Sequence, residues 1–124
     1  MNPAYAPPPL PTLWAVLHTY RFNCTSEATL GYGIAKALKL EDVQFEAEVV
    51  LDAKSRIDFL LEGGVGVELK VKGSANEVLA QLMRYADFAR ITSLVLVTTR
   101  AKHIDMPDSV RGKPLRVHFV GGIQ

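Results

Sequence analysis

Two acidic residues and a lysine lie close together in the stretch Arg56–Lys70, which reads RIDFLLEGGVGVELK. Apolar residues alternate with others on both sides of a Gly-Gly pair, and a period of two is typical of strands that bury one face. The stretch therefore predicts a hairpin that carries Asp58, Glu68 and Lys70 on its open face. Its buried face is predicted to consist of Ile57, Phe59, Leu61, Val65, Val67, Leu69 and Val71.

The length of the turn decides whether these polar side chains meet. If residues 62–64 (Glu-Gly-Gly) form a three-residue loop, with Gly in the left-handed conformation, Leu61 pairs with Val65 and Asp58 lies opposite Glu68. A two-residue Gly-Gly loop would place the two acids on opposite faces. Opposed residues on one face have Cβ atoms roughly 4.5–5.5 Å apart, and carboxylates that close repel unless a cation lies between them. A divalent cation with oxygen ligands meets that need.

The rest of the chain predicts a single α/β domain. At 124 residues and 48% hydrophobic, the chain is long and apolar enough for one core. Residues 1–11 are Pro-rich and predicted to be an irregular tail, and residues 12–124 one domain. We expect helices over Leu13–Phe22 (Thr12 as N-cap), from Thr25-Ser26-Glu27 to Leu40, and over Glu77–Arg90 (Ser74 or Asn76 as N-cap). Besides the hairpin, we expect strands Phe45–Leu51, Thr92–Thr99 and Leu115–Val120 in a mixed sheet.

Further polar residues lie on these elements. Gln81 and Tyr85 are four residues apart and so share a helix face. Glu27 either complements its helix dipole or adds a third carboxylate to the site. Lys72 lies on the same face as Lys70 and is as likely to touch phosphate as to be solvated. The remaining residues considered, His18, His103, His118, Arg84 and Arg100, are expected in the core or on the solvated surface.

Charge and cysteine content bear on partners and setting. Residues 51–124 hold eleven Lys and Arg against eight Asp and Glu, which suits a polyanion such as nucleic acid, although a solvated mixed-charge surface is the simpler interpretation. Cys24 is the single cysteine, so no disulfide forms within one chain, and a reducing, cytoplasmic setting is expected. No apolar run reaches the length of a membrane span, and the N-terminus lacks the pattern of a secretory signal.

Together, Asp58, nine intervening residues and Glu68-Leu69-Lys70 give D-x9-E-x-K, which resembles the motif of the PD-(D/E)XK nuclease superfamily. The predicted order of elements over about residues 26–120 is similar to the αβββαβ core of that superfamily. Gln81-x-x-x-Tyr85 resembles a motif of its RecB-like and lambda-exonuclease-like branches, and Glu27 matches an acid that those branches often carry. Ile57 stands where the motif's name has Pro, a residue commonly absent in the superfamily.

The resemblance implies a restriction-endonuclease-like fold and a Mg²⁺-dependent deoxyribonuclease, with Mn²⁺ as a substitute. Asp58, Glu68 and the main-chain carbonyl of Leu69 would hold the metal. Glu27 would support it directly or through water. Lys70 would position or deprotonate the attacking water. Gln81 and Tyr85 would steady the site and contact the DNA backbone.

Other interpretations stay open. Asp58, Glu68 and Lys70 would also suit a surface ion-pair cluster, worth under about 1 kcal/mol. Within the resemblance, the chain would be a structure-specific endonuclease similar to Holliday-junction resolvases, acting as a homodimer, or a non-catalytic nucleic-acid-binding domain on the same fold. The Pro-rich segment 1–11 would suit a protein partner, although a disordered end is the simpler interpretation.

Overall fold

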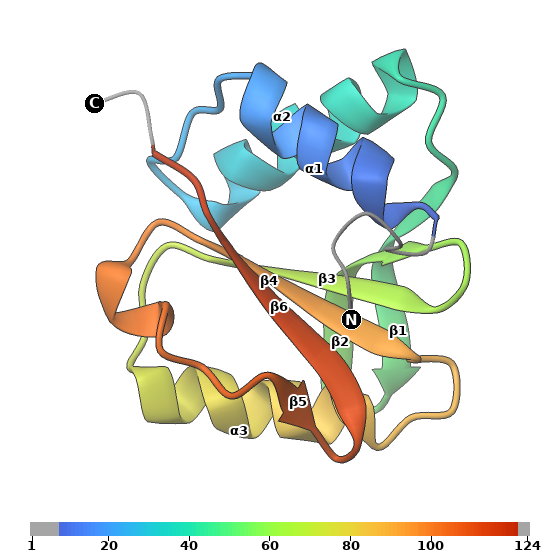
Figure 1. Cartoon of the computed structure of the whole chain (residues 1–124), viewed down its shortest axis with the longest axis vertical. Coiled ribbons are helices and arrows are strands. Elements are labelled where there is room, and N and C mark those ends of the chain that lie inside the picture. Colours follow the sequence, from blue (N-terminus) through green and yellow to red (C-terminus); the bar gives the residue numbers. More distant parts are fainter. Residues whose placement is uncertain (1–7, 122–124) are drawn as a thin grey trace.

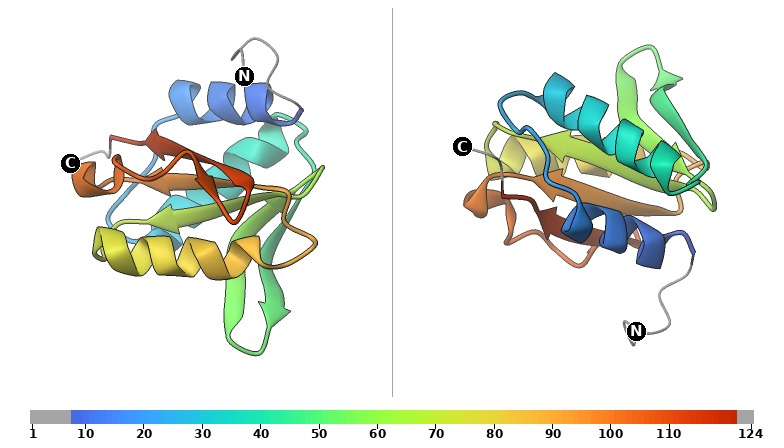
Figure 2. Two further views of the ribbon diagram at one scale, coloured as in Figure 1. Left: turned by 60° about the horizontal axis from the view of Figure 1, so that its bottom comes forward. Right: turned by 90° about the horizontal axis from the view of Figure 1, so that it is seen from above.

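The computed structural model describes residues 8–121, which form a mixed β-sheet between two layers of helices (Figure 1). Helices α1 (Leu10–Thr19) and α2 (Glu27–Leu40) cover one face, and helix α3 (Ala75–Ala86) covers the other (Figure 2). The strands are β1 (Phe45–Asp52), β2 (Ser55–Leu61), β3 (Val65–Lys70), β4 (Ser93–Thr98), β5 (Ser109–Val110) and β6 (Lys113–Phe119), with a 3₁₀ turn η2 at Ala101–His103. Within residues 8–121, no helix is both long and apolar enough to cross a membrane.

The sheet has the order β1-β2-β3-β4-β6-β5, and the prediction of an α/β fold with a mixed sheet is confirmed. The pairs β1–β2, β2–β3 and β5–β6 are antiparallel, whereas β3–β4 and β4–β6 are parallel. The connection from β3 to β4 runs through α3, as parallel neighbours require a crossover. The turn end of the β1–β2 hairpin projects beyond the helical layers (Figure 2).

The loop between β2 and β3 is three residues long, which is one of the two lengths left open by the sequence. Leu61 pairs with Val65 and Phe59 with Val67, so the register is the one that brings Asp58 toward Glu68. Gly63 and Gly64 have φ of 80° and 81°, which only glycine adopts without strain. The Thr92 N–H donates to the Gly64 carbonyl over 2.8 Å, which ties this loop to the start of β4.

Apolar side chains fill both spaces between sheet and helices. The cluster beneath α1 and α2 includes the four α2 residues Leu30, Ile34, Ala37 and Leu38, together with Val67 and Leu69 of β3. The cluster beneath α3 includes Val78, Leu82 and Tyr85, together with Leu94 and Leu96 of β4. Strand β4 is buried along its whole length, as predicted for a central strand covered on both sides.

Several predicted boundaries differ from the structure. Helix α1 begins at Leu10 rather than Leu13, and Thr12 lies inside it instead of capping it, because Pro11 fits the first helical turn. Leu10 is fully buried, so residues 8–11 do not belong to an irregular tail; residues 1–7 lie outside the described part. Helix α3 starts after its cap Ser74 and ends at Ala86, four residues earlier than predicted, before the chain turns to bury Ile91.

The predicted alternation of β2 is wrong at Ile57. Phe59 and Leu61 belong to the cluster beneath α1 and α2, but Ile57 belongs to the cluster beneath α3. The paired register of β1 and β2 skips Glu48 and Asp58, and Glu48 has a φ of 56°. Both strands are therefore irregular at this point, and the side chains beyond it change faces. Apolar spacing cannot reveal this change, because Ile57 is buried on either face.

Two glycine substitutions test how tightly this sheet is packed. At Gly66, an added Cβ would lie 2.6 Å from Ile57 Cδ1 and 3.0 Å from Ile91 Cδ1, so Gly66→Ala is expected to destabilise the fold by about 1–3 kcal/mol.

At the helical Gly31, an added Cβ would lie 3.4 Å from Leu69 Cδ1, an ordinary contact. Gly31→Ala is therefore expected to stabilise the fold by about 0.5–1 kcal/mol. Urea unfolding of the two variants measures both, and equal effects would contradict the packing described.

Candidate active site

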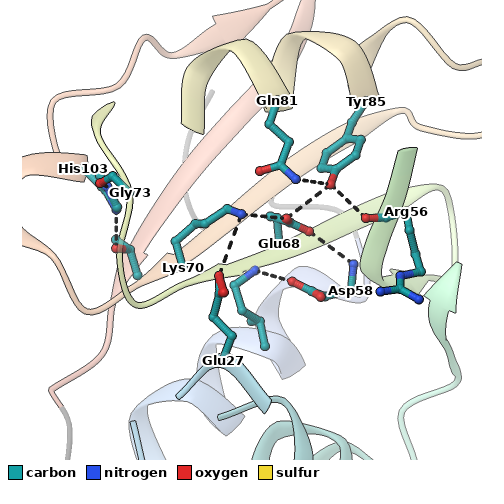
Figure 3. A network of polar contacts seen from close by, with 11 residues as sticks. Glu27, Arg56, Asp58, Glu68, Lys70, Gly73, Gln81, Tyr85 and His103 are labelled. Carbon is teal, nitrogen blue, oxygen red and sulfur yellow. Dashed lines mark hydrogen bonds and ion pairs between the residues drawn. The ribbon is translucent and has the colours of Figure 1, made fainter. Parts of the chain in front are cut away.

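Glu68 is the buried centre of the candidate site. Its side chain is 4% exposed, and it points from β3 toward α3 (Figure 3). Three groups contact its carboxylate: the Asp58 N–H at 3.3 Å, the Tyr85 hydroxyl at 3.2 Å and the Lys70 ammonium at 3.4 Å. Strands β2 and β3 and helix α3 thus each contribute to holding one acidic side chain.

Helix α3 brings Gln81 and Tyr85 to this carboxylate. The Gln81 Nε2 donates to the Tyr85 hydroxyl over 2.6 Å, and Tyr85 Oη also lies 2.8 Å from the Arg56 carbonyl. Tyr85 is 1% exposed, so its hydroxyl has to find partners inside the protein. A tyrosine hydroxyl carries one proton, which the Arg56 carbonyl and the Glu68 carboxylate compete to accept.

Asp58 occupies the place where the β2–β3 ladder opens. The Leu69 N–H donates to Asp58 Oδ2 over 2.8 Å, so a side-chain oxygen replaces a main-chain acceptor. The Asp58 N–H donates to the Glu68 carboxylate instead of a main-chain carbonyl. The two acids therefore meet, as the loop length predicts, but through the opened ladder and not as an ordinary cross-strand pair. Because N–H and C=O of one strand residue point to the same side, the Leu69 carbonyl also lies on the Asp58 side.

Helix α2 adds a third acid from the opposite layer. Ser26 caps this helix by accepting from the Thr29 N–H at 3.1 Å, and the cap places Glu27 in the first turn. Glu27 Oε1 lies 3.8 Å from Lys70 Nζ. The side chain of Lys70 is 18% exposed and lies between the carboxylates of Glu27 and Glu68 (Figure 3). The structure thus brings all six sequence-predicted side chains into one connected network.

Burial changes the protonation of this network. The pKa of Glu68 is raised to about 8, first by removal from water and then by the nearby Asp58 charge, while Lys70 opposes the shift. The pKa of the Tyr85 hydroxyl is raised as well, first by burial and then by Glu68. When Glu68 is protonated, it can donate to Tyr85 Oη and leave the tyrosine proton to the Arg56 carbonyl. The apo site therefore favours a neutral Glu68 near neutral pH.

The surroundings of the network suit a cation and an anion together. Asp58, Glu68 and the Leu69 carbonyl are the groups that could supply oxygen ligands to a metal ion here. Among the described residues, no group of three or more His, Cys, Asp and Glu side chains is arranged to hold a metal ion. Two carboxylates and a carbonyl are nevertheless enough for Mg²⁺, which keeps several waters. A hollow of about 500 Å³ next to them is lined by residues of both charges, including Lys70, Lys72 and Arg84.

The histidines lie away from this network or act structurally. His103 is fully buried, and its ring nitrogens lie 2.7 Å from Thr98 Oγ1 and 2.7 Å from the Gly73 carbonyl. Since a carbonyl only accepts, Nε2 donates to Gly73, and His103 fixes the loop that follows Lys70. His18 and His118 meet edge to face, 4.8 Å apart, across α1 and β6. Burial, followed by the neighbouring His18, lowers the pKa of His118.

Two contributors to the site carry no signal in the sequence. The Arg56 main-chain carbonyl receives the Tyr85 hydroxyl, and a main-chain contact does not depend on residue type. Glu48 adopts a positive φ beside Asp58, although its residue type does not favour that conformation. Helical spacing did predict that Gln81 and Tyr85 share a face, and the structure confirms it.

Comparisons with protein-family models, with curated proteins and with solved structures found no match for this chain.

The raised pKa of Glu68 predicts a specific dependence of stability on pH. The folded state holds a proton up to about pH 8, whereas the unfolded state loses it near pH 4.5. Between these values the folded state binds more protons, so the unfolding free energy falls as pH rises, by up to ~1.4 kcal/mol per pH unit. Glu68→Gln is expected to remove this component and to be more stable than the parent at pH 8.

Chemical unfolding of both proteins at pH 5, 6, 7 and 8 measures the difference between their slopes. The other titratable groups are present in both proteins, so their contributions cancel. Parallel stability curves would contradict the assigned protonation of Glu68.

Proposed function

We propose that this protein is a metal-dependent nuclease that hydrolyses phosphodiester bonds in DNA, and that it belongs with the PD-(D/E)XK enzymes. The observation that carries the proposal is the convergence of Asp58, Glu68 and Lys70 on one place, braced by Tyr85 from α3. The order α2, β1, β2, β3, α3, β4 supports it, since it equals the αβββαβ order of a restriction-endonuclease-like core. A surface ion-pair cluster would not bury Glu68 or surround it with a hydrogen-bonded tyrosine.

The donor set fits Mg²⁺ or Mn²⁺. Asp58, Glu68 and the Leu69 carbonyl would hold the ion, and Glu27 would reach it directly or through water. The raised pKa of Glu68 supports this fit, because burial and the charge of Asp58 cause it, and a cation would offset both. When bound, such an ion lowers the pKa of a water and withdraws charge from the phosphoryl group.

Lys70 is placed to act on that water. Its amine lies 3.4 Å from Glu68 and 3.8 Å from Glu27, in a side chain that reaches solvent. From there it would hold the nucleophilic water in line, accept a proton from it and face the charge that builds on the phosphate. Lys72 and Arg84 line the same hollow and would attract the phosphates on either side. Gln81 and Tyr85 hold Glu68 in place and position it.

One observation favours a second candidate, a nucleic-acid-binding domain without catalysis. The Lys70 amine already lies between two carboxylates, so it offsets part of the acidic charge of the network without a metal. Cleavage assays separate the two functions: retained DNA binding without cleavage, unaffected by Glu68→Ala, would favour the binding domain.

Lys70→Ala is expected to lower the cleavage rate by at least ~100-fold, because it removes the group that acts on the water. Folding and Mn²⁺ binding should persist, since the amine is not a ligand. The assay is incubation of plasmid and linear DNA with Mg²⁺ or Mn²⁺, with chelator as the blank. Lys113→Ala, which removes an amine bonded to the Phe88 carbonyl elsewhere, is the matched control and should cleave normally. Normal cleavage by the Lys70 variant would refute its role.

Asp58→Asn and Glu68→Gln are each expected to weaken Mn²⁺ binding by more than about tenfold, because each removes a charged ligand. Binding to the parent protein at pH 7 should release about one proton, since the Glu68 pKa of about 8 keeps the free site protonated. Glu68→Gln should release none. Calorimetric titration in two buffers of different ionisation enthalpy measures affinity and proton release together. Unchanged affinity in both variants would refute the assigned ligands.

A further inference from the structure

Three hollows on the surface share lining residues and border one another beside the candidate site. The first, of about 600 Å³, lies beside α2 and the α1–α2 connection. It shares Ala28 and Tyr32 with a second hollow, which Asp58 also lines. The second hollow shares Glu27 with the third, which Lys70 lines. The three hollows, which we call the groove, therefore follow one another from one flank of α2, over the exposed Tyr32, past Asp58 to Lys70. Glu68 is buried and does not line them.

The first hollow is aromatic and open. The rings of Tyr20 and Phe22 stack with centroids 6.5 Å apart, and Gly33 adjoins Phe22 so closely that an added Cβ would lie 3.1 Å from it. Tyr32 is 74% exposed and Leu40 is 64% exposed, although both are large and apolar. We call this the aromatic hollow; its lining residues include Tyr20, Arg21, Phe22, Tyr32, Gly33, Lys36 and Leu40.

Charge alternates along the groove. The charged residues that line the aromatic hollow are Arg21 and Lys36, both cationic. The middle hollow is acidic, with Glu27, Glu48 and Asp58. The third hollow is lined by three cations, Lys70, Lys72 and Arg84, against the acids Glu27 and Glu77. A chain of phosphates matches this pattern when a divalent cation fills the middle, because both ends then attract the flanking phosphates.

We propose that the aromatic hollow is a base-stacking subsite, and that the substrate is an unpaired nucleic-acid strand whose scissile phosphate lies at Lys70. This inference rests on the proposed nuclease function and specifies its substrate. An exposed aromatic ring can stack only on a base whose face is free, and a duplex hides its base faces. Glu27 and Tyr32 both lie on α2, so this helix connects the aromatic hollow to the candidate site.

The test measures binding of two fluorescent oligonucleotides of equal length and charge, one of ten thymidines and one in which the central bases are absent. The proteins carry Lys70→Ala to stop cleavage and are titrated with Mn²⁺ present. Tyr32→Ala in this background is expected to weaken binding of the thymidine strand about tenfold and to leave the base-free strand unchanged. Because Tyr32 is largely exposed, its truncation should not disturb folding.

Two further variants give the comparison its controls. Phe119→Ala truncates another half-exposed aromatic residue, which lies on β6 outside the three hollows, and should change neither affinity. Lys36→Gln should weaken both strands alike and reduce the salt dependence of binding by about one charge, because it contacts phosphate and not base.

Equal weakening of both strands by Tyr32→Ala, or no weakening of either, would overturn the stacking subsite. So would a change of sedimentation from dimer to monomer in that variant, since the hollow would then be an interface between copies. These outcomes are separate from failure of the proposed function. If the parent protein with Mn²⁺ leaves the thymidine strand uncut while Tyr32→Ala still abolishes base-dependent binding, the nuclease assignment fails and the subsite stands.

Discussion

The structure depends on one costly interaction, the burial of the Glu68 carboxylate between the sheet and α3. A carboxylate removed from water must be hydrogen-bonded, neutralised or protonated. Here the Asp58 N–H, the Tyr85 hydroxyl and the Lys70 amine surround it, and its pKa nevertheless rises to about 8. The ionised form of Glu68 is therefore unfavourable on its own, and a nearby cation would stabilise it.

The opening of the β2–β3 ladder makes this arrangement possible. In a regular antiparallel pair, main-chain groups of the two strands would satisfy one another, and few would remain for side chains. At Asp58 the main-chain N–H turns to Glu68, and the Asp58 carboxylate takes the Leu69 N–H instead. The neighbouring Glu48 adopts a positive φ, which costs free energy at a non-glycine residue. Such a cost persists where the surroundings enforce it, and here the buried Ile57 on one side and Phe59 on the other hold the distorted strand.

The parts of this site that follow local rules could be predicted from the sequence. The Gly-Gly pair predicts a tight hairpin loop of two or three residues, and the three-residue loop that forms fixes the register that brings Asp58 to Glu68. Helical spacing places Gln81 and Tyr85 on one face, and Ser26 marks the start of α2. What could not be predicted depends on tertiary contacts. The face that Ile57 buries, the early start of α1 at Leu10 and the role of the Arg56 carbonyl all depend on which elements lie nearby.

Helix α2 links the position of the groove to the position of the candidate site. Glu27, in the first turn of α2, lines two of the three hollows and reaches Lys70, so this helix sets both the third carboxylate and the aromatic hollow. A rotation of α2 that brought Glu27 closer to Lys70 would therefore also displace the residues of the aromatic hollow. The helix resists rotation because Leu30, Ile34 and Leu38 are fully buried beneath it and Ser26 caps its start. The position of Tyr32 relative to Lys70 is therefore fixed by the packing of the helix.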